Sequence, residues 1–363
     1  MAMADDIYRK LAKVLDTLPN GFPSTESGVE IKLLEKIFTP RQADLFCDLR
    51  LTFETAEEIA GRTGRPLEGL EEELKQMREA GQVFAIDMGG TWFFRMMPWA
   101  FGIYEFQNRR LDLEFAKLNE AFSPVYSRQF FSRTPQLMRV LPIEEELEMR
   151  QEALPYEKVS WLIDQNQSFL VNDCICKKEQ GLLGHPCDRP MQVCLAMAPV
   201  PGVFDNNSEG RRLTKEEARA LLLKTEEMGL VHLTANQQGD NYYICNCCGC
   251  CCGVLRSINN LGIPASRVIN SHYYAEIDPE KCIGCGTCAD ERCQVQAVEE
   301  GEEAYRIDPE GCIGCGLCIR TCAEEAIRLV ARDPEKILVP PVNEEAWFEE
   351  RGRQRGVDFS KYK

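Results

Sequence analysis

Eight cysteines lie near the C-terminus. Six of them follow two copies of one motif, Ile-Asp-Pro-Glu-x-Cys-x2-Cys-x2-Cys, at residues 277–288 and 307–318, and a fourth cysteine follows each copy, at Cys293 and Cys322. This spacing predicts two [4Fe–4S] cubanes, because three cysteines at x2 intervals wrap one corner of a cube and the fourth reaches across to the other cluster. The first cluster is therefore predicted to bind Cys282, Cys285, Cys288 and Cys322. The second is predicted to bind Cys312, Cys315, Cys318 and Cys293.

The alternative to cubanes at these eight cysteines is a pair of zinc knuckles. Zinc sites prefer two separated cysteine pairs, so a repeated run of three plus one is poorly suited to them. Glycines between the ligands let the chain turn tightly and aim backbone N–H groups at the cluster sulfurs, which raises the reduction potential. These glycines are Gly284, Gly286, Gly314 and Gly316.

Residues 273 to about 332 resemble the two-cluster bacterial ferredoxin domain. They depart from the family pattern in two ways. Four residues, and not three, separate Cys288 from Cys293, and Gln294 and Ala323 stand where the family usually has proline. The resemblance implies a low-potential electron carrier, with surroundings of the second cluster that differ from those in the family.

Ten further cysteines lie between residues 174 and 252, in two groups. The first group, Cys174, Cys176, Cys187 and Cys194, supplies four thiolates that can hold one cubane or one zinc. The second group is denser and comprises Cys245, Cys247, Cys248, Cys250, Cys251 and Cys252.

Adjacent residues point in different directions, so all six cysteines of the second group cannot bind one cube. Two interleaved registers with x2 spacing remain. Cys245, Cys248 and Cys251 have the three-ligand corner geometry and need one distant cysteine. Cys247 and Cys250 form the other register. We predict one or two further Fe–S clusters here. The alternatives are a zinc held by the first group beside reduced cysteines, or a redox-active dithiol.

The N-terminal region predicts helix, turn, helix and hairpin, which is the order of a winged helix. Thr55 to Glu58 reads as a capping box that opens the first helix, and Val83 to Arg95 reads as the hairpin. The second helix is expected from Leu67 to Ala80, because the apolar residues Leu67, Leu70, Leu74 and Met77 recur at helical spacing and Gly81 ends it. Its acidic side chains argue against DNA binding, because five glutamates oppose only Lys75 and Arg78. A structural or partner-docking role is favoured.

The middle region repeats this order of elements. Thr214 to Glu217 reads as a second capping box, Gly229 ends the helix, and residues 230–233 and 241–246 read as a hairpin. This predicts a second, truncated winged-helix-like unit that presents the cysteines. The predicted fold class is α+β, with a winged-helix-like domain at 1–120 and a cysteine-rich middle domain at 121–272. A two-[4Fe–4S] ferredoxin domain at 273–333 and a C-terminal arm at 334–363 complete the prediction.

Nearly the whole chain resembles a loosely defined family of ferredoxin-type, 4Fe–4S-binding proteins of anaerobes. The residues that carry the resemblance are Cys174-Ile175-Cys176-Lys177, Cys187-Asp188-Arg189-Pro190 to Cys194, and Cys245 to Cys252. The resemblance implies an electron-transfer subunit that works beside a flavin-, tungsten- or molybdenum-containing oxidoreductase, or in an assembly like heterodisulfide reductase.

Composition limits the partners and the compartment. The net charge of −16 over 363 residues repels nucleic acid, so basic patches on proteins are the expected targets. Nineteen cysteines without a leader-like N-terminus indicate a reducing, cytoplasmic environment. No apolar run reaches the length of a membrane span.

The favoured function is electron transfer through several [4Fe–4S] clusters to or from an oxidoreductase partner. The first alternative is a redox enzyme with a catalytic cluster or dithiol at Cys245 to Cys252. The second is an Fe–S sensor that binds DNA through the winged helix, which the acidic helix disfavours. We find no complete nucleotide-binding loop and no zinc-protease motif.

Overall fold

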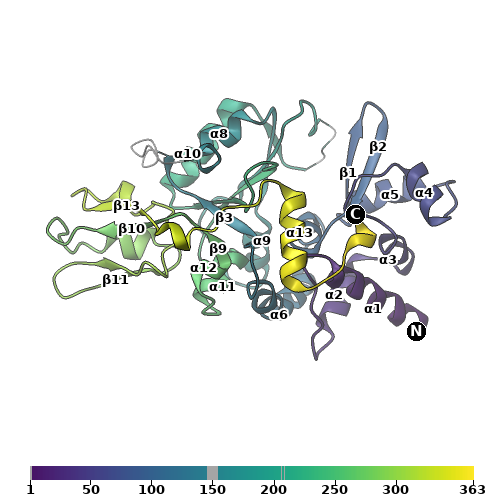
Figure 1. The fold of residues 1–363 in the computed structure, drawn as a ribbon, viewed down its shortest axis with the longest axis horizontal. Helices are drawn as coiled ribbons and strands as arrows, with labels where there is room; N and C mark the ends of the chain where they lie inside the picture. Colours follow the sequence, from purple (N-terminus) through teal and green to yellow (C-terminus); the bar gives the residue numbers. More distant parts are fainter. Residues whose placement is uncertain (1, 145–153, 206, 208) are drawn as a thin grey trace. The chain divides into compact units, whose positions relative to one another are not determined.

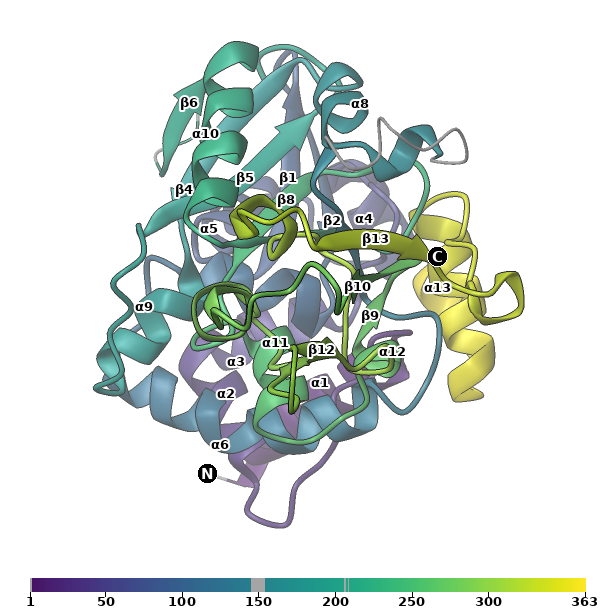
Figure 2. The same ribbon diagram turned by 90° about the vertical axis from the view of Figure 1, so that its left-hand side faces the viewer.

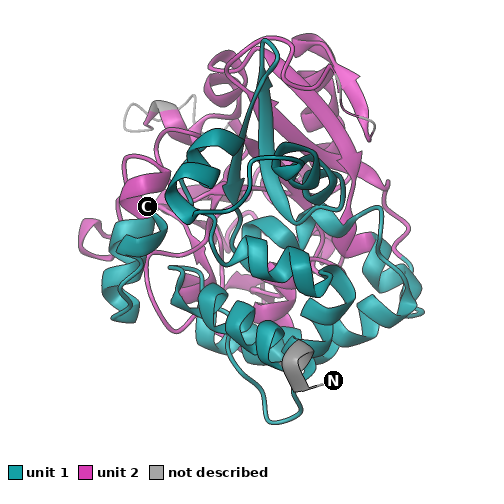
Figure 3. Cartoon of the chain, turned by 90° about the vertical axis from the view of Figure 1, so that its right-hand side faces the viewer, with its two compact units in different colours: residues 1–130, 178–186, 348–363 teal, residues 131–177, 187–347 magenta. Residues whose placement is uncertain are grey.

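The structure is a computed structural model that describes residues 2–144, 154–205, 207 and 209–363. Its contacts divide the chain into two compact units (Figure 3). Unit 1 comprises residues 1–130, 178–186 and 348–363, and unit 2 comprises residues 131–177 and 187–347. This division differs from the four segments expected from the sequence, because the ferredoxin-like segment and the cysteine-rich middle segment fall in one unit. Among the described residues, every helix is too short or too polar to cross a bilayer.

Unit 1 is built mainly from helices (Figure 1). Four of them pack together around a core of leucines and phenylalanines: α1 (Ala2–Thr17), α2 (Val29–Ile37), α3 (Pro40–Phe46) and α6 (Leu113–Phe130). The side chains of Leu11, Leu33, Phe46 and Phe122 are completely buried in this unit. Unit 1 also contains most of α13 (Glu344–Arg355).

The helix, helix and hairpin expected in the N-terminal region are present. They are α4 (Ala56–Thr63), α5 (Leu70–Glu79), β1 (Val83–Met88) and β2 (Thr91–Met96). Thr55 and Glu58 form the predicted capping box, and β1 pairs antiparallel with β2. However, α5 begins at Leu70 because Gly69 precedes it in the left-handed conformation, and Leu67 is 47% exposed. The expectation that the helix begins at Leu67 is therefore wrong. The winged-helix assignment itself stays a prediction.

Unit 2 contains a seven-stranded sheet with the strand order β6-β4-β5-β8-β7-β3-β9. Neighbouring strands are antiparallel, except for the parallel pair of β3 and β9. The strands are β3 (Met138–Leu141), β4 (Ser168–Asp173), β5 (Gln192–Ala198), β6 (Arg211–Leu213), β7 (Val231–Ala235), β8 (Tyr243–Cys247) and β9 (Ile269–Asn270).

Helices α8 (Val159–Asp164) and α10 (Lys215–Glu227) cover this sheet (Figure 2). Leu162, Leu195, Leu222 and Ile244 are buried in the core between them. The predicted capping box at Thr214 is present at the start of α10. A separate winged-helix-like unit is absent from this described region, because β8 pairs with β5 as well as with β7, so the expected hairpin lies inside the larger sheet.

The ferredoxin-like segment adds two short antiparallel ladders to unit 2. Strand β10 (Tyr273–Ile277) pairs with β13 (Ile327–Ala331), and β11 (Val298–Glu299) pairs with β12 (Arg306–Ile307). The remaining α-helices are α9 (Ile175–Leu182), α11 (Gly253–Asn259) and α12 (Ala265–Val268). All eighteen cysteines with predicted metal-binding roles belong to unit 2.

Candidate metal centres

Seven of the eight ferredoxin-like cysteines have electrostatic neighbours within the predicted sets, and the place of Cys322 in the first set stays a prediction. Cys293 interacts electrostatically with the thiols of Cys312, Cys315 and Cys318. Cys288 interacts in the same way with Cys282 and Cys285. Chain folding thus brings the fourth cysteine of the first run to the second run, as a crossover ligand requires.

The two fourth cysteines have equivalent backbone contacts. The N–H of Ala297 donates to Cys293 Sγ at 3.1 Å, and the N–H of Ala326 donates to Cys322 Sγ at 3.3 Å. The extra residue before Cys293 therefore leaves this local geometry intact. Such N–H groups stabilise a negatively charged sulfur and favour the reduced state of a cluster.

The two runs differ in their exposure to solvent, although their sequences are nearly identical. Ile283 in the first run is 68% exposed, whereas Ile313 at the matching position is 2% exposed. A Cβ atom on Gly284 would meet no neighbour, whereas one on Gly314 would lie 2.3 Å from the carbonyl oxygen of Tyr273. The first run faces solvent, and the second run is packed into unit 2.

Burial has a direct effect on the thiols of the second run. It raises the pKa of Cys315 to about 12 and raises the pKa of Cys318 well above its ordinary value. An isolated thiolate is disfavoured at such a site because a buried charge without a partner is costly. Binding to iron removes this penalty, because the cation compensates the thiolate charge.

Strand alternation in β5 and β8 determines where three of the middle cysteines lie. Leu195 pairs with Ile244, and both side chains lie in the core under α10. Side chains alternate between the two faces of a sheet, so Cys194, Cys245 and Cys247 lie on the opposite face. The thiols of Cys194 and Cys245 interact there.

Six thiols form a closed ring on this face of the sheet. Each thiol interacts with its two neighbours in the ring, whose order is Cys174, Cys176, Cys252, Cys247, Cys245, Cys194 and back to Cys174. All six are buried or half-buried. Among the described residues the ring contains no set of three sulfurs compact enough to hold a single ion. Among the described residues, the six thiols of the ring are therefore not arranged as a single-ion site.

The acidity of the ring thiols alternates from one to the next. The pKa values of Cys174 and Cys252 lie well below the ordinary value, and that of Cys245 is about 6, because each thiolate accepts hydrogen bonds from both neighbouring thiols. The same interactions raise the pKa values of the three intervening thiols, Cys176, Cys247 and Cys194. All six groups can ionise together only when bound cations balance their charge.

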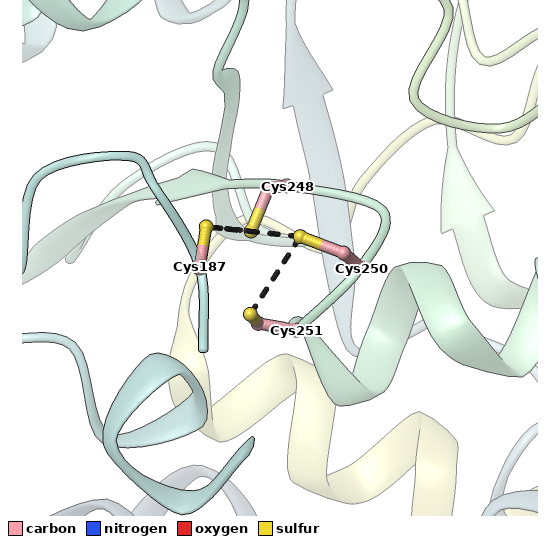
Figure 4. A group of neighbouring side chains, drawn as sticks. All are labelled: Cys187, Cys248, Cys250 and Cys251. Carbon is pink, nitrogen blue, oxygen red and sulfur yellow. Dashed lines mark hydrogen bonds between the residues drawn. The ribbon is translucent and has the colours of Figure 1, made fainter. Parts of the chain in front are cut away.

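The other four middle cysteines form a separate and much tighter group (Figure 4). Their thiols, those of Cys187, Cys248, Cys250 and Cys251, all lie within 4.8 Å of one another. The hydrogen bond from Cys251 lowers the pKa of Cys248 to about 5. Burial raises the pKa of Cys250 to about 11.

The distribution of the ten middle cysteines differs from both groupings that the spacing suggested. Cys187, which the spacing assigned to the first group, lies in the tight four-thiol group. The other three members of the first group, Cys174, Cys176 and Cys194, belong to the ring. The proposed corner of Cys245, Cys248 and Cys251 does not form, because Cys245 lies in β8 and the other two follow the strand end. The x2 spacing therefore does not predict which thiols meet, and strand periodicity accounts for the common face of Cys194, Cys245 and Cys247.

Lys177 is a functional candidate that the spacing analysis did not single out. Its side chain is 2% exposed, and Nζ donates to the carbonyl oxygen of Pro190 at 2.7 Å. Its positive charge lowers the pKa of both Cys174 and Cys248, as a smaller contribution beside the thiol hydrogen bonds. The sequence signal for this lysine is its position directly after a Cys-x-Cys pair. Because a buried charge needs a partner, its burial beside the thiols indicates that it stabilises thiolates.

A buried polar network was also missed. His232 Nδ1 lies 2.6 Å from Oδ1 of Asn246, a residue that stands between two ring cysteines in the sequence. The Nε2 atom of His232 lies 3.7 Å from the carboxylate of Glu226. Glu226 in turn accepts a hydrogen bond from Arg320 at 2.5 Å. Arg320 stands between Cys318 and Cys322 in the sequence. The network joins the cysteine-bearing strand β8 to the ferredoxin-like segment.

Gln294 makes a second connection between the two cysteine-rich segments. Its Oε1 accepts from the N–H of Gly249 at 2.9 Å, and its carbonyl oxygen accepts from Asn259 Nδ2 at 2.9 Å. Gln294 follows Cys293 directly and replaces the proline usual in ferredoxins, which has no side-chain acceptor. Gln294, which departs from the ferredoxin pattern, therefore connects the ferredoxin-like segment to the middle segment.

The chain matches no curated protein and no solved structure significantly. One protein-family comparison does match: residues 274–323 correspond to the 4Fe-4S dicluster domain. The matched segment holds all eight cysteines of the two repeated runs. This match shows that the chain contains a ferredoxin-type 4Fe–4S dicluster domain and that 4Fe–4S clusters are its cofactors.

Proposed function

We propose that this protein passes single electrons between an oxidoreductase partner and a buried centre in its cysteine-rich middle segment. The first cluster, bound by Cys282, Cys285, Cys288 and Cys322, exchanges electrons with the partner. The second, bound by Cys293, Cys312, Cys315 and Cys318, relays them inward. The six-thiol ring holds a polynuclear iron–sulfur centre that receives them.

The different burial of Ile283 and Ile313 is the observation that carries this proposal. Electron transfer to a partner requires close approach, and only the first run is open to solvent. The second run is packed within unit 2, where the N–H of Ile143 donates to the carbonyl oxygen of Cys315 at 3.1 Å. An electron that enters at the cluster of the exposed run is transferred next to the cluster of the buried run.

The contacts of Gln294 and of Arg320 support the inward step. Gln294 follows a ligand of the second cluster and binds the loop at Gly249. Arg320 binds Glu226, which lies beside His232 and Asn246 at the ring. Short hydrogen-bonded connections of this kind hold redox centres at fixed, close separations.

The partner is expected to present a basic surface to the first cluster. Exposed acidic residues surround the open run and its hairpin, namely Glu280, Asp290, Glu291, Glu299, Glu300, Glu302 and Glu303. Complementary charge speeds the encounter of electron-transfer proteins. A flavin-, tungsten- or molybdenum-containing oxidoreductase, or a heterodisulfide-reductase-like assembly, in the cytoplasm of an anaerobe is our proposal for the partner class.

A freeze-quench experiment tests the order of the centres. Anaerobic protein is mixed with less than one equivalent of reduced viologen, and EPR follows the arrival of electrons at each centre. In Cys285→Ala the first cluster loses a ligand, and we expect electrons to reach the middle centre at least tenfold more slowly. Cys47→Ala, at a buried thiol in unit 1, is the control. Equal rates in all three proteins would refute the relay.

One observation favours a second candidate function, catalysis at the Cys245 to Cys252 segment. A polar pocket of about 410 Å³ in unit 2 is lined by Cys250, Cys293 and Gln294, together with Asn259 and Asp290. A small substrate there would contact one exposed thiol and lie beside the second cluster. Turnover of a disulfide or other small oxidant by the isolated protein, abolished in Cys250→Ala, would favour this candidate over the relay.

A further inference from the structure

We propose that Cys187, Cys248, Cys250 and Cys251 bind one metal ion through four thiolates, without bridging sulfide, at a site separate from every iron–sulfur cluster of the chain. The ion is zinc or a single iron, the two metals that tetrahedral four-thiolate sites take. This inference does not depend on the proposed electron relay.

The distances between the sulfur atoms fit one ion. The Sγ atom of Cys187 lies 3.8 Å from Sγ of Cys248 and 3.7 Å from Sγ of Cys250. The Sγ atoms of Cys250 and Cys251 are 3.6 Å apart. A tetrahedral site with zinc–sulfur bonds of about 2.3 Å has edges of about 3.8 Å between its sulfurs. Three of the six edges thus match a tetrahedral single-ion site, and the other three are no longer than 4.8 Å.

The same distances exclude two other uses of these thiols. The ligands of a cubane bind different irons at separate corners, so their sulfurs lie further apart than those bound to one ion. The eight ferredoxin-like thiols illustrate this difference, because among the described residues they form no group as compact as this one. A disulfide has its sulfurs about 2.0 Å apart, far closer than these pairs.

The origin of the four ligands gives the ion a structural role. Three come from the loop that follows β8, and Cys187 comes from the loop that precedes β5. An ion would therefore join two loops that are more than sixty residues apart in the sequence and would fix the path of the chain between Cys247 and Cys252. Both of these residues belong to the ring, so the ion positions ligands of the neighbouring polynuclear centre.

Metal analysis of the intact protein is the first test. Zinc, iron and acid-labile sulfide are measured on anaerobically purified protein, with X-ray absorption at the zinc edge and Mössbauer spectroscopy for iron. We expect about one ion per chain in an all-sulfur shell at about 2.3 Å, without a neighbouring metal. Zinc in that shell identifies the ion as zinc, and an isolated high-spin iron identifies it as iron. Absence of both overturns the proposal.

Two matched variants assign the ion to these residues. In Cys250→Ala we expect the loss of about one metal ion per chain with sulfide unchanged, because a mononuclear site contains none. Cys47→Ala should keep every metal, because its buried thiol lies in unit 1 and outside the described four-thiol group. Loss of iron and sulfide together in Cys250→Ala, or no loss of metal, would overturn the assignment. If Cys250→Ala does not fold, judged by circular dichroism, the spectra of the intact protein decide.

Discussion

The N–H of Gly249 donates to Gln294 Oε1, and this contact ties the cysteine-rich loop to the residue that follows Cys293. The two backbones approach so closely that a Cβ atom on Gly249 would lie 2.3 Å from the carbonyl oxygen of Gln294. Glycine is needed at this position for space, since its backbone does not adopt the left-handed conformation.

Gly249→Ala should therefore separate the two segments locally. We expect a loss of about 1–3 kcal/mol in the free energy of unfolding, because the added methyl group overpacks a tight contact. Gly253→Ala is the matched control, since a Cβ atom there meets no neighbour and alanine favours the helix that it begins. Anaerobic thermal unfolding measures both. Equal midpoints for the two variants would contradict the tight contact.

The matching isoleucines of the two runs should differ sharply in their contribution to stability. Ile313→Ala should cost about 2–5 kcal/mol, because it leaves a cavity in a packed site. Ile283→Ala should change the free energy of unfolding by less than about 0.5 kcal/mol, because the side chain is exposed. Denaturant titration under argon provides the comparison. Similar losses at both positions would show that the first run is also packed.

Removal of the Glu226 charge should raise a cluster potential. Burial alone would raise the pKa of Glu226, but hydrogen bonds and charge interactions with His232 and Arg320 hold it below its ordinary value. The carboxylate is therefore ionised at neutral pH and disfavours an added electron nearby. In Glu226→Gln we expect an upward shift of at least one ferredoxin-type potential, measured by EPR-monitored redox titration.

Glu216→Gln is the control for this shift. Glu216 lies on the same helix and begins its first turn, but its side chain is exposed. Solvent screens such a charge, so the potentials should stay where they are in the parent protein. An equal shift in both variants would mean that net charge, and not the buried network, sets the potential.

Asp44 predicts an acid-sensitive contribution to stability in unit 1. Hydrogen bonds from Arg65 at 2.8 Å and from Lys10 at 3.1 Å hold the pKa of this carboxyl below its ordinary value. Because the folded-state pKa is lowered, the stabilisation is complete above the unfolded-state pKa near 4 and is lost as the pH falls through the folded value.

The corresponding measurement compares the parent protein with Asp44→Asn across pH 3 to 7. We expect the variant to be less stable by about 0.2–1 kcal/mol at neutral pH, since solvent screens this partly exposed ion pair. The difference should shrink below the unfolded-state pKa near 4, where the aspartate itself becomes protonated. A difference that stays constant with pH would assign the effect to side-chain packing.

The sequence predicts the local elements of this protein well and the long-range grouping of its thiols poorly. The capping boxes at Thr55 and Thr214 and the hairpin over Val83 to Arg95 are determined by neighbours in the chain, and all are present. The seven-stranded sheet was not foreseen, because its pairings join strands that lie far apart in the sequence. Short strands such as Arg211–Leu213 carry too little pattern to predict their partners.

The middle cysteines show the same limit at the level of the site. The sequence predicts two x2 registers that separate Cys245 from Cys247, whereas the alternation of strand β8 places both on one face of the sheet. The join of Cys187 to Cys248 depends on how two loops meet, and spacing within either loop carries no information about it. The repeated ferredoxin-like runs were predictable because their ligands are contributed by one short, self-contained segment.

Cys285 is exposed and Cys315, at the matching position of the second run, is half-buried, so the two clusters differ in the order in which air would damage them. Oxygen and the superoxide derived from it reach a cluster through solvent, so oxidative loss of iron begins at the open run. The packed run then outlasts it, and a briefly aerated sample retains one intact cubane for some time. The clusters bound by the two copies of one motif thus have unequal lifetimes in air, and the shorter-lived cluster is the one exposed to solvent.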